Sequence, residues 1–377
     1  MHSDPLICQL ALTMIPKIGA ITARKLIAYL GSAEAVFMEK SSTLAKIPGI
    51  GPFLAKSISL KPYLSEAEKE LSEMKQNNIS YVYYRDPEYP WRLKNCEDGP
   101  LFLYYKGRPD FARPKILSVV GTRSASNYGK EACRNILSTL SAKYPDLVVV
   151  SGLAYGIDIA AHRAALEFGL DTFAILAHGL TTIYPSSHRN TAFRIEKQGA
   201  LLSDFHSNVL PERNNFLRRN RIIAGISEAT LVIESGRKGG ALITADIASS
   251  YNREVFALPG RAGDIYSAGC NYLLKNNIAA LVETGEDIES YLGWESSQPG
   301  RKASLVIKEA LTSDEKRILK SIAEEPGIGQ EILSLRAEIP ISKLMGILLQ
   351  MELKNWVTLM PGNVYETSAH FVDTWQH

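Results

Sequence analysis

The stretch SDFHSNVLPERNNFLRRNRIIAGISEATLVIESGRKGGALITADIA, residues 203–248, contains the alternation that decides the fold. An arginine-rich helical run leads into a short apolar strand, residues 229–235. The strand ends in the glycine-rich loop 236–240, which opens another helical run. Alternation of helices with apolar strands is typical of proteins in which helices cover both faces of a sheet. The stretch therefore predicts an α/β domain.

The same alternation starts at residue 114 and continues on both sides of this stretch. Near-continuous apolar strands predict a parallel sheet that is buried on both faces. Several of these strands end in glycine, and ligands of open α/β sheets bind beyond the carboxyl ends of the strands. We therefore expect the strand-end loops to converge on one rim. The strands are predicted at 116–121, 147–152, 172–179, 200–205, 229–235 and 254–260.

Positive charge is concentrated in one place. The 377 residues carry a formal net charge of only +2, yet four arginines, Arg213, Arg218, Arg219 and Arg221, fall within nine residues. Concentrated positive charge indicates an anionic partner. The four cysteines show no metal-binding or redox spacing, and no apolar run is long enough to cross a membrane. We expect a cytoplasmic protein with reduced thiols and no membrane partner.

The first 60 residues contain an internal repeat. The sequence Pro16-Lys17-Ile18-Gly19 recurs 32 residues later as Pro48-Gly49-Ile50-Gly51, and each copy lies between helical runs. The pattern resembles a tandem helix-hairpin-helix module, in which a glycine turn presents backbone N–H groups to a DNA phosphate. The alternative is a helical bundle that only supports the fold, so DNA contact by this module stays open.

Changes in composition divide the rest of the chain. A charged helical run and a short strand precede the segment 85–107, which we expect to be irregular scaffold because it is rich in proline and aromatic residues. Three helical runs and a hairpin with a Pro361-Gly362-Asn363 turn are typical of a winged helix; it could bind protein or DNA. The expected parts are a helix-hairpin-helix module at 1–62, a sheet domain at 63–295 (extension 63–113, core 114–295), a linker at 296–304 and a winged helix at 305–377.

Nucleotide-binding motifs are missing from the sheet domain. No GxGxxG follows a strand and no GxxxxGK[ST] is present, so we expect no nucleotide cofactor. Asp158 and His162 stand at i and i+4, where they could form an acid/base pair or half a metal site. Helix capping and packing is the favoured interpretation, and neither this pair nor His178 and His188 predicts a metal.

Three strand-end loops offer anion-binding groups without such a motif. Gly121-Thr122-Arg123 combines a tight turn with a guanidinium, Ser151-Gly152 follows the next strand, and Lys238-Gly239-Gly240 opens a helix. Three such loops on one rim, facing the arginine-rich run, favour a polyanion as ligand.

Helical geometry orients the arginine-rich run. Ile222, Ile223 and Ile226 mark its buried face, which leaves Arg218 and Arg221 to reach solvent. Arg219 falls on the sheet-facing side, where it must find a phosphate or a protein carboxylate as acceptor. Asn214 or Asn215 is the expected N-cap. Phe216 lies at the edge of the same side, either in the core or as a platform on which a base stacks.

The motifs together resemble the DprA/Smf family. VVGTR (119–123), SGLAYGID (151–158), HGLTTIYP (178–185), RRNRIIAGIS (218–227), VIESGRKGGALITA (232–245), FALPG (256–260) and GCNYLL (269–274) occur in the family's order. The resemblance implies an extended Rossmann-like domain that binds single-stranded DNA in natural transformation. It also implies a homodimer, protection of the incoming strand and loading of the RecA recombinase, without catalytic activity.

The resemblance also implies the DNA-binding residues. Three departures from the family's pattern are mild: Thr122 stands where serine is common, the family often has an acidic residue near Thr181, and Lys238-Gly239-Gly240 replace Ser-Gly-Ser. Motif and resemblance together give the expected nucleic-acid-binding set, which is Gly121, Arg123, Ser151, Gly152, Arg213, Phe216, Arg218, Arg219, Asn220, Arg221, Lys238, Gly239 and Gly240. We expect Arg123→Ala or Arg219→Ala to weaken strand binding sharply without unfolding the protein.

The alternative function is a nucleotide-processing enzyme related to the lysine-decarboxylase-like phosphoribohydrolases. Those enzymes use a Pro-Gly-Gly-x-Gly-Thr-x-x-Glu loop on a similar sheet. Gly239-Gly240 and Thr244 match part of that loop, but the glycine before the threonine is absent and Ala245-Asp246 replace the rest.

Overall fold

The computed structural model describes residues 4–60, 62–294, 311–324, 328–354, 356–360 and 364–367. It divides into two compact units, Met1–Ser297 and Gln298–His377, and each is described by itself. The expected linker 296–304 and the Pro361-Gly362-Asn363 turn lie outside the described residues.

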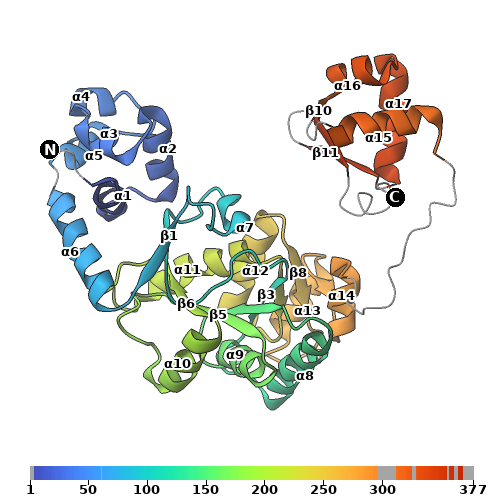
Figure 1. Ribbon diagram of the computed structural model, residues 1–377. Helices are drawn as coiled ribbons and strands as arrows, with labels where there is room; N and C mark the ends of the chain where they lie inside the picture. The colour runs from blue at the N-terminus through green and yellow to red at the C-terminus, as the bar shows by residue number, and fades with distance from the viewer. Residues whose placement is uncertain are drawn as a thin grey trace. The chain divides into compact units, whose positions relative to one another are not determined.

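The first unit begins with six helices that contain the repeat (Figure 1). Lys17 and Gly49, at equivalent positions of the two turns, both have a positive φ, of 69° and 86°. Gly19 and Gly51 are the N-caps of the helices that follow. The repeat is therefore one of backbone geometry as well as of sequence. The helices are α1 (Pro5–Met14), α2 (Ala20–Leu30), α3 (Ala33–Met38), α4 (Ser41–Leu44), α5 (Pro52–Ser59) and α6 (Pro62–Gln76).

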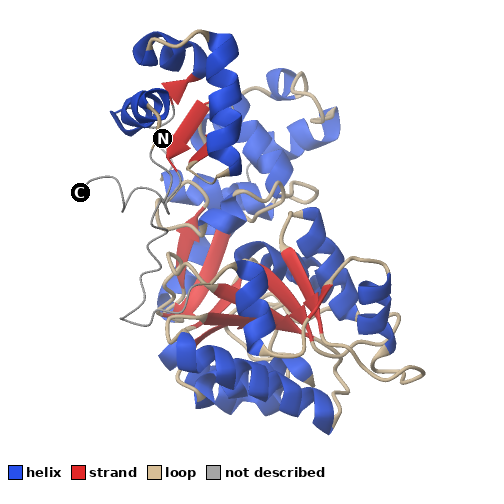
Figure 2. Cartoon of the chain, turned by 90° about the vertical axis from the view of Figure 1, so that its right-hand side faces the viewer, coloured by secondary structure: helices blue, strands red, loops and turns tan. Residues whose placement is uncertain are grey.

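A nine-stranded sheet follows, in the order β1-β2-β6-β5-β4-β3-β7-β8-β9, and the views in Figures 1 and 2 show it as one twisted layer. All neighbours from β6 to β9 are parallel, whereas β2 pairs antiparallel with both β6 and β1. The strands are β1 (Ser80–Tyr83), β2 (Phe102–Gly107), β3 (Ile116–Val120), β4 (Val148–Ser151), β5 (Asp171–Ile175), β6 (Ala200–Ser203), β7 (Ala229–Val232), β8 (Glu254–Ala257) and β9 (Ala280–Leu281).

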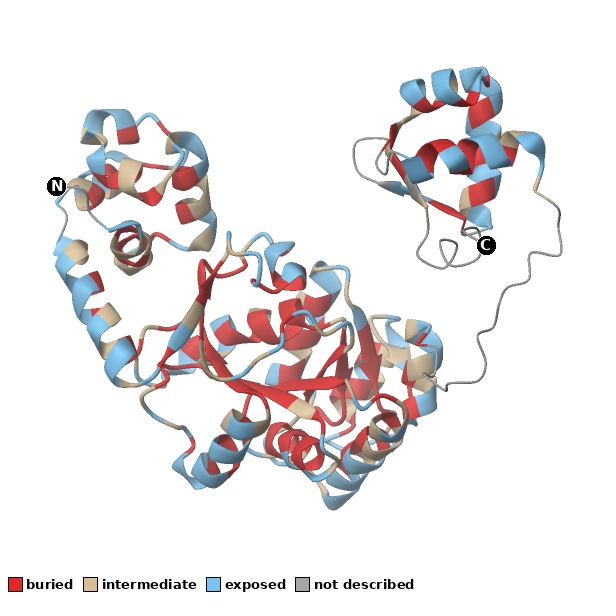
Figure 3. Ribbon diagram, in the orientation of Figure 1, coloured by how far each residue is buried: buried red, intermediate tan, exposed pale blue. Residues whose placement is uncertain are grey.

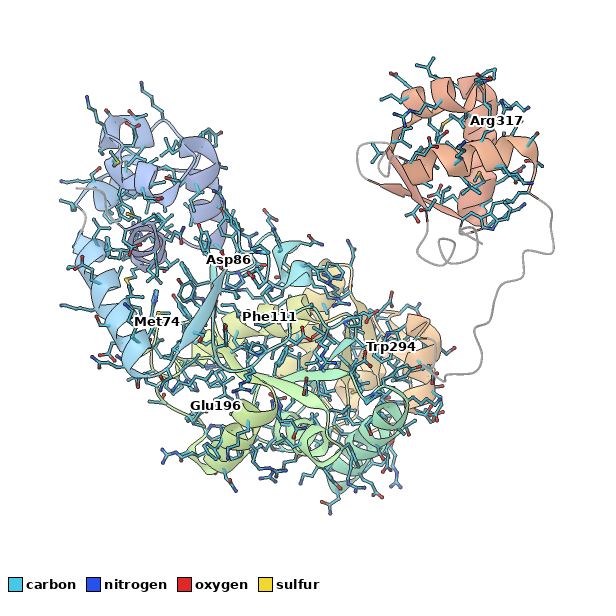
Figure 4. The ribbon with its side chains drawn as sticks, in the orientation of Figure 1. Met74, Asp86, Phe111, Glu196, Trp294 and Arg317 are labelled. Atoms are coloured by element: carbon cyan, nitrogen blue, oxygen red, sulfur yellow. The ribbon has the colours of Figure 1, made fainter. Side chains whose placement is uncertain are left out.

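The prediction of an irregular segment at 85–107 was wrong in part. This segment contains α7 (Trp91–Lys94) and β2, which extends the sheet beyond β6. Phe102 and Tyr104 face the cluster that holds α1 and α6, including Met74, which Figure 4 labels, whereas Leu103 packs in the cluster on the opposite side. The aromatic residues therefore attach the N-terminal helices to the sheet.

Helices cover both faces of the parallel part of the sheet, and Figure 3 shows the strands as an almost continuous buried layer. Alternate strand residues enter two apolar clusters: α11, α12 and α13 pack on one face, and α8, α9 and α14 on the other. Trp294, at the end of this unit, closes the second cluster by packing edge-on against Tyr144. The helices are α8 (Asn127–Lys143), α9 (Ile157–Glu167), α10 (Arg189–Gln198), α11 (Arg213–Ile226), α12 (Gly240–Ser250), α13 (Ala268–Lys275) and α14 (Gly285–Leu292).

The order of the strands determines where a ligand can bind. From β3 the chain proceeds in one direction through β4, β5 and β6, and then crosses to the other side of β3 with β7. The loops that leave β3 and β7 therefore diverge to opposite faces of the sheet, and a crevice opens between them at the carboxyl ends of the strands.

The described residues of the second unit form three helices and a three-stranded sheet in the order β10-β12-β11. The apolar faces of its helices form one cluster around Leu319, Leu333 and Leu348. The elements are α15 (Ser313–Glu324), β10 (Ile328–Gly329), α16 (Gln330–Ala337), α17 (Ile341–Leu353), β11 (Val357–Met360) and β12 (Val364–Thr367). This arrangement is that of a winged helix. Among the described residues of the whole chain, no helix has the length and apolar character that a membrane span requires.

Candidate nucleic-acid interface

A pocket of about 300 Å³ lies beyond the carboxyl end of β3, where the strand order reverses. The loop after β3, one side of α11 and the first turn of α12 form its walls. We call it the rim pocket. It brings together seven of the thirteen residues expected from the sequence: Gly121, Arg123, Phe216, Arg219, Asn220, Gly239 and Gly240. Its remaining lining residues are Val120, Thr122, Ala154, Asp158, Leu217, Ile223, Ala241 and Thr244.

The loop after β3 is held in place by Glu234, a buried residue that sequence reasoning did not single out. One carboxylate oxygen of Glu234 accepts a hydrogen bond from the Ser126 hydroxyl (2.5 Å) and the other accepts one from the Ser126 backbone N–H (2.9 Å). The backbone carbonyl of Glu234 accepts the N–H of Thr122 at 2.7 Å. Ser126 in turn caps α8 through the N–H of Gly129. The position of Glu234, directly after a buried strand and close to the rim, was the available signal.

Arg123 and Phe216 form the exposed mouth of the rim pocket. The guanidinium carbon of Arg123 lies 5.1 Å from the centre of the Phe216 ring, and that of Arg219 lies 6.0 Å from it. Tyr184, which is 48% exposed, meets the Phe216 ring edge-on with 5.9 Å between ring centres. Within the described part of the chain, Arg123 has no ion-pair partner. Its donors are therefore free for an anion, and an aromatic surface lies beside them.

Tyr184 was missed as an individual site residue, although its motif, HGLTTIYP, was part of the family resemblance. Its place beside Phe216 depends on how the loop after β5 crosses the rim, and no local periodicity carries that information.

Arg219 faces the sheet as predicted, but its acceptors differ from those expected. It is only 3% exposed, and it donates to the backbone carbonyls of Gly152 (2.8 Å) and Ile175. Asp158, a pocket residue, adds electrostatic attraction. Burial nevertheless lowers the pKa of Arg219 to about 10 and raises the pKa of Asp158, so for both groups desolvation outweighs their attraction. Arg219 joins the ends of β4 and β5, and its removal would disturb the fold as well as the pocket.

Ser151 and Gly152 lie beneath the pocket and do not line it. The Ser151 hydroxyl is fully buried and donates to the carbonyl of Val119 at 2.6 Å. A Cβ atom at position 152 would overlap the guanidinium of Arg219. The glycine is thus needed for close packing against Arg219. Ala154, from the loop after β4, and Asp158, from the first turn of α9, line the pocket in their place.

The prediction that Arg221 reaches solvent was wrong. Its side chain is only 15% exposed, and it forms an ion pair with Asp204 and donates to the backbone carbonyl of Asp98. The helical wheel placed Arg221 off the apolar side of α11. That second side is also covered, because α7 packs there and Gly225 of α11 closely approaches Leu93 and Cys96.

The other two arginines of the run are exposed but lie outside the rim pocket. Arg218 lines a separate pocket between α11 and the N-terminal helices, and its guanidinium lies 5.1 Å from the centre of the Phe205 ring. Arg213 is the first residue of α11. The N-cap is Glu212, whose side chain makes no capping hydrogen bond, so the prediction of Asn214 or Asn215 as N-cap was wrong.

The first turn of α12 closes the pocket from the side of β7. Gly239 is the N-cap of α12, and a side chain there would overlap the Ser235 hydroxyl. At Gly240 a Cβ would meet nothing within 4 Å, and Gly240 and Ala241 both line the pocket, whereas the N–H of Leu242 donates to the carbonyl of Gly239. A helix N-terminus favours anions. Lys238 is exposed and lines a neighbouring pocket, so it lies beside the rim pocket and outside its lining.

Asp158 and His162 are both buried in α9, and their neighbours are consistent with packing. The Thr172 hydroxyl donates to the carbonyl of Val149, so Nδ1 of His162 must be the donor in the 2.8 Å contact with Thr172. Burial lowers the pKa of His162 to about 3, which keeps the ring neutral. Asp158 thus lines the pocket, and His162 packs behind it against Thr172 of β5.

Comparison with known families agrees with this geometry. The sequence model of the family described as DNA recombination-mediator protein A matches residues 80–293, which carry the sheet and every residue of the rim pocket. The chain belongs to this family. A second model, described as the DprA winged helix domain, matches residues 305–363.

Relatives extend the similarity beyond these segments. Protein Smf of Escherichia coli is 34% identical over 78% of this chain and 79% of its own length. The DNA processing protein DprA of Streptococcus pneumoniae is 35% identical over 62% of this chain and 80% of its own. An X-ray structure of the S. pneumoniae protein superposes with a TM-score of 0.66 at 29% identity, covering 77% of this chain and 98% of that one.

A solved structure of DNA processing protein A from Helicobacter pylori is also similar. Its TM-score is 0.51 at 26% identity, and it covers 57% of this chain and 95% of that one. That structure concerns the single-stranded DNA binding mode of the H. pylori protein.

Proposed function

We propose that this protein binds single-stranded DNA at the rim pocket, chiefly through phosphates. The observation that carries the proposal is the exposed Arg123, which has no ion-pair partner among the described residues and lies over the ring of Phe216 at the mouth of the pocket. A single strand offers both a phosphate for a guanidinium and an unpaired base for an aromatic ring. The single-stranded DNA binding mode of the H. pylori relative supports the same conclusion.

Each part of the pocket has a distinct task in this proposal. Arg123 forms charge-assisted hydrogen bonds to one phosphate. The N–H groups at the start of α12, next to Gly240, stabilise a second negative group without contributing a formal charge. Phe216 and Tyr184 offer ring surface for bases. None of these groups reads a base edge, so we expect little sequence preference.

The test is the binding of Arg123→Ala to a labelled oligothymidine across a salt series, measured by fluorescence anisotropy. Loss of one phosphate contact should reduce the slope of log K against log salt by roughly 0.7. Lys275→Ala is the matched control, because Lys275 is exposed at the end of α13 and lines neither the rim pocket nor the neighbouring pocket beside Lys238. If Arg123→Ala binds as the wild type and the Lys275 control do, the rim pocket is not the binding site.

The wider role that we propose is protection of single strands taken up in transformation and loading of the RecA recombinase onto them. The description of the family as a recombination mediator supports this role. The proposal includes a cytoplasmic location, action as a homodimer and no catalytic activity. It is tested by RecA filament assembly on strands precoated with single-strand-binding protein: the wild type should accelerate assembly, and Arg123→Ala should not.

The hydrolase alternative gains no support from the pocket. The partial match to the phosphoribohydrolase loop consisted of Gly239-Gly240 and Thr244, and Ala245-Asp246 stand in place of the loop's end. Thr244 lines the rim pocket, but Asp246 lines the neighbouring pocket beside Lys238. Release of a free base from nucleoside monophosphates by the purified protein would favour the enzyme and contradict our proposal.

A further inference from the structure

A second, more basic depression adjoins the rim pocket and is not accounted for by the proposed site. It is a pocket of about 590 Å³ between α8 and α9, and Arg123 lines both it and the rim pocket. We call it the α8–α9 groove, after the helices that carry Lys130, Arg134 and Arg163 along its walls and Glu167 opposite Arg134.

The groove carries an excess of positive charge that the protein itself does not neutralise. Arg134 forms an ion pair with Glu167, in which one guanidinium nitrogen lies 2.5 Å from a carboxylate oxygen. Lys130 and Arg163 are exposed, and within the described residues neither has an ion-pair partner. Among the described residues, Lys130 and Arg163 thus add two unpaired cations to the pocket that Arg123 also lines, which favours a ligand with several negative charges.

The groove also holds an exposed aromatic ring in a fixed orientation. Tyr155 is 50% exposed, its ring meets His188 edge-on with 4.9 Å between ring centres, and its hydroxyl accepts a hydrogen bond from Ser187 at 3.2 Å. The ring of His188 is itself anchored to the carbonyl of Leu153 at 2.8 Å. These contacts already order the Tyr155 ring. A base that stacks on it therefore does not lose binding free energy to the conformational entropy of that side chain.

We propose that the α8–α9 groove binds the continuation of the single strand that occupies the rim pocket. Lys130 and Arg163 contact its phosphates, and a base stacks on Tyr155. An exposed ring can stack an unpaired base, which a single strand offers and a duplex does not. The strand therefore crosses Arg123 and runs between α8 and α9. This inference rests on the proposed function, since it extends the same bound molecule.

The test compares two probes on the full chain: an oligothymidine of about six nucleotides, near the small end of known site sizes, and one of about twenty. Lys130→Ala/Arg163→Ala should lower affinity for the long probe about tenfold and reduce its salt slope by roughly 1.4, at about 0.7 for each phosphate contact. The short probe should bind as it does to the wild type. Lys275→Ala, which removes an exposed charge elsewhere, should change neither.

Substitutions of Tyr155 test the contribution of base stacking to binding without changing the charge of the groove. Tyr155→Leu should weaken binding of the long probe about fivefold or more, within the range of one base–aromatic stack. Tyr155→Trp should restore it, which a role of Tyr155 in folding alone would not predict. The inference is overturned if the double variant binds the long probe as the wild type does, or if both probes weaken equally. A loss confined to duplex DNA would also overturn it. If the wild type binds neither probe, the proposed function itself fails.

Discussion

Replacement of Arg219 by alanine should lower the stability of the protein, because the Arg219 guanidinium is bonded inside the fold. Arg219 donates to the carbonyls of Gly152 and Ile175 and contacts the side-chain oxygen of Asn220 at 3.3 Å. In Arg219→Ala both carbonyls stay buried without this donor, and Asp158 loses its nearby positive charge. An unsatisfied buried polar group costs about 1–3 kcal/mol, and the substitution leaves two such carbonyls. We therefore expect a loss of roughly 2–6 kcal/mol in the free energy of unfolding.

The assay is urea unfolding followed by circular dichroism, with the free energy taken from the midpoint and the slope. The matched control is Arg213→Ala, an exposed arginine on the same helix, which should change the free energy of unfolding by less than about 0.5 kcal/mol. A loss below about 1 kcal/mol for Arg219→Ala would refute the conclusion that its guanidinium joins the ends of β4 and β5.

Gly152 provides an independent check of the same contact. Since a Cβ at position 152 would overlap the Arg219 guanidinium, Gly152→Ala should displace it and destabilise the protein by itself. In Arg219→Ala the obstacle is gone, so Gly152→Ala should then cost less. The double-mutant cycle should therefore show a coupling of about 1 kcal/mol or more, and strictly additive losses would contradict the packing argument.

The other predictions concern three buried or partly buried residues that hold the sheet rim together: Glu234, His162 and Arg221. Glu234→Gln should weaken DNA binding more than it lowers stability, because the loop after β3 loses a carboxylate anchor at Ser126; equal binding in a titration would contradict this. The depressed pKa of His162 means that stability should fall by roughly 1.4 kcal/mol per pH unit below about 6.5, while Asp158, with its raised pKa, opposes this at lower pH. The pH dependence of the stability difference between wild type and His162→Gln should isolate the histidine, and this difference should become constant above about pH 7.5. Arg221→Met should lower the unfolding midpoint and leave DNA affinity within about twofold, because its partners are within the protein.

Local periodicity was enough to predict the parallel sheet and the sheet-facing side of α11. Every predicted strand from residue 116 onward overlaps an observed one, because parallel strands buried on both faces consist of almost unbroken apolar residues. Ile222, Ile223 and Ile226 are buried as the helical wheel requires, and Arg219 lies on their side. The spacing of apolar residues along the chain determines the strands and the buried side of α11, so both can be predicted from the sequence alone.

Features that depend on a second partner were not predictable in this way. β2 was missed because its apolar and aromatic residues follow a proline-rich stretch, and its pairing with β1 and β6 cannot be read from local sequence. Arg221 was placed in solvent because a helical wheel assumes one buried side, whereas α7 covers the other. The acceptors of Arg219 are backbone carbonyls. Every residue has one, so no sequence motif predicts which of them Arg219 contacts.

The arginine-rich run has a buried arginine, Arg219, that positions Phe216 beneath the exposed Arg123 of the loop after β3. Arg219 is fixed by backbone acceptors and lies 6.0 Å from the centre of the Phe216 ring, measured from its guanidinium carbon. Phe216 is thereby held under Arg123, whose guanidinium is open to solvent. A ligand that meets Arg123 finds an arginine and a ring whose positions are set by the sheet beneath, and such preorganisation lowers the entropy cost of binding. The number of arginines in the run therefore overstates how many can bind a ligand. Arg219 and Arg221 are bonded within the protein, and Arg219 supports the pocket that Arg123 lines.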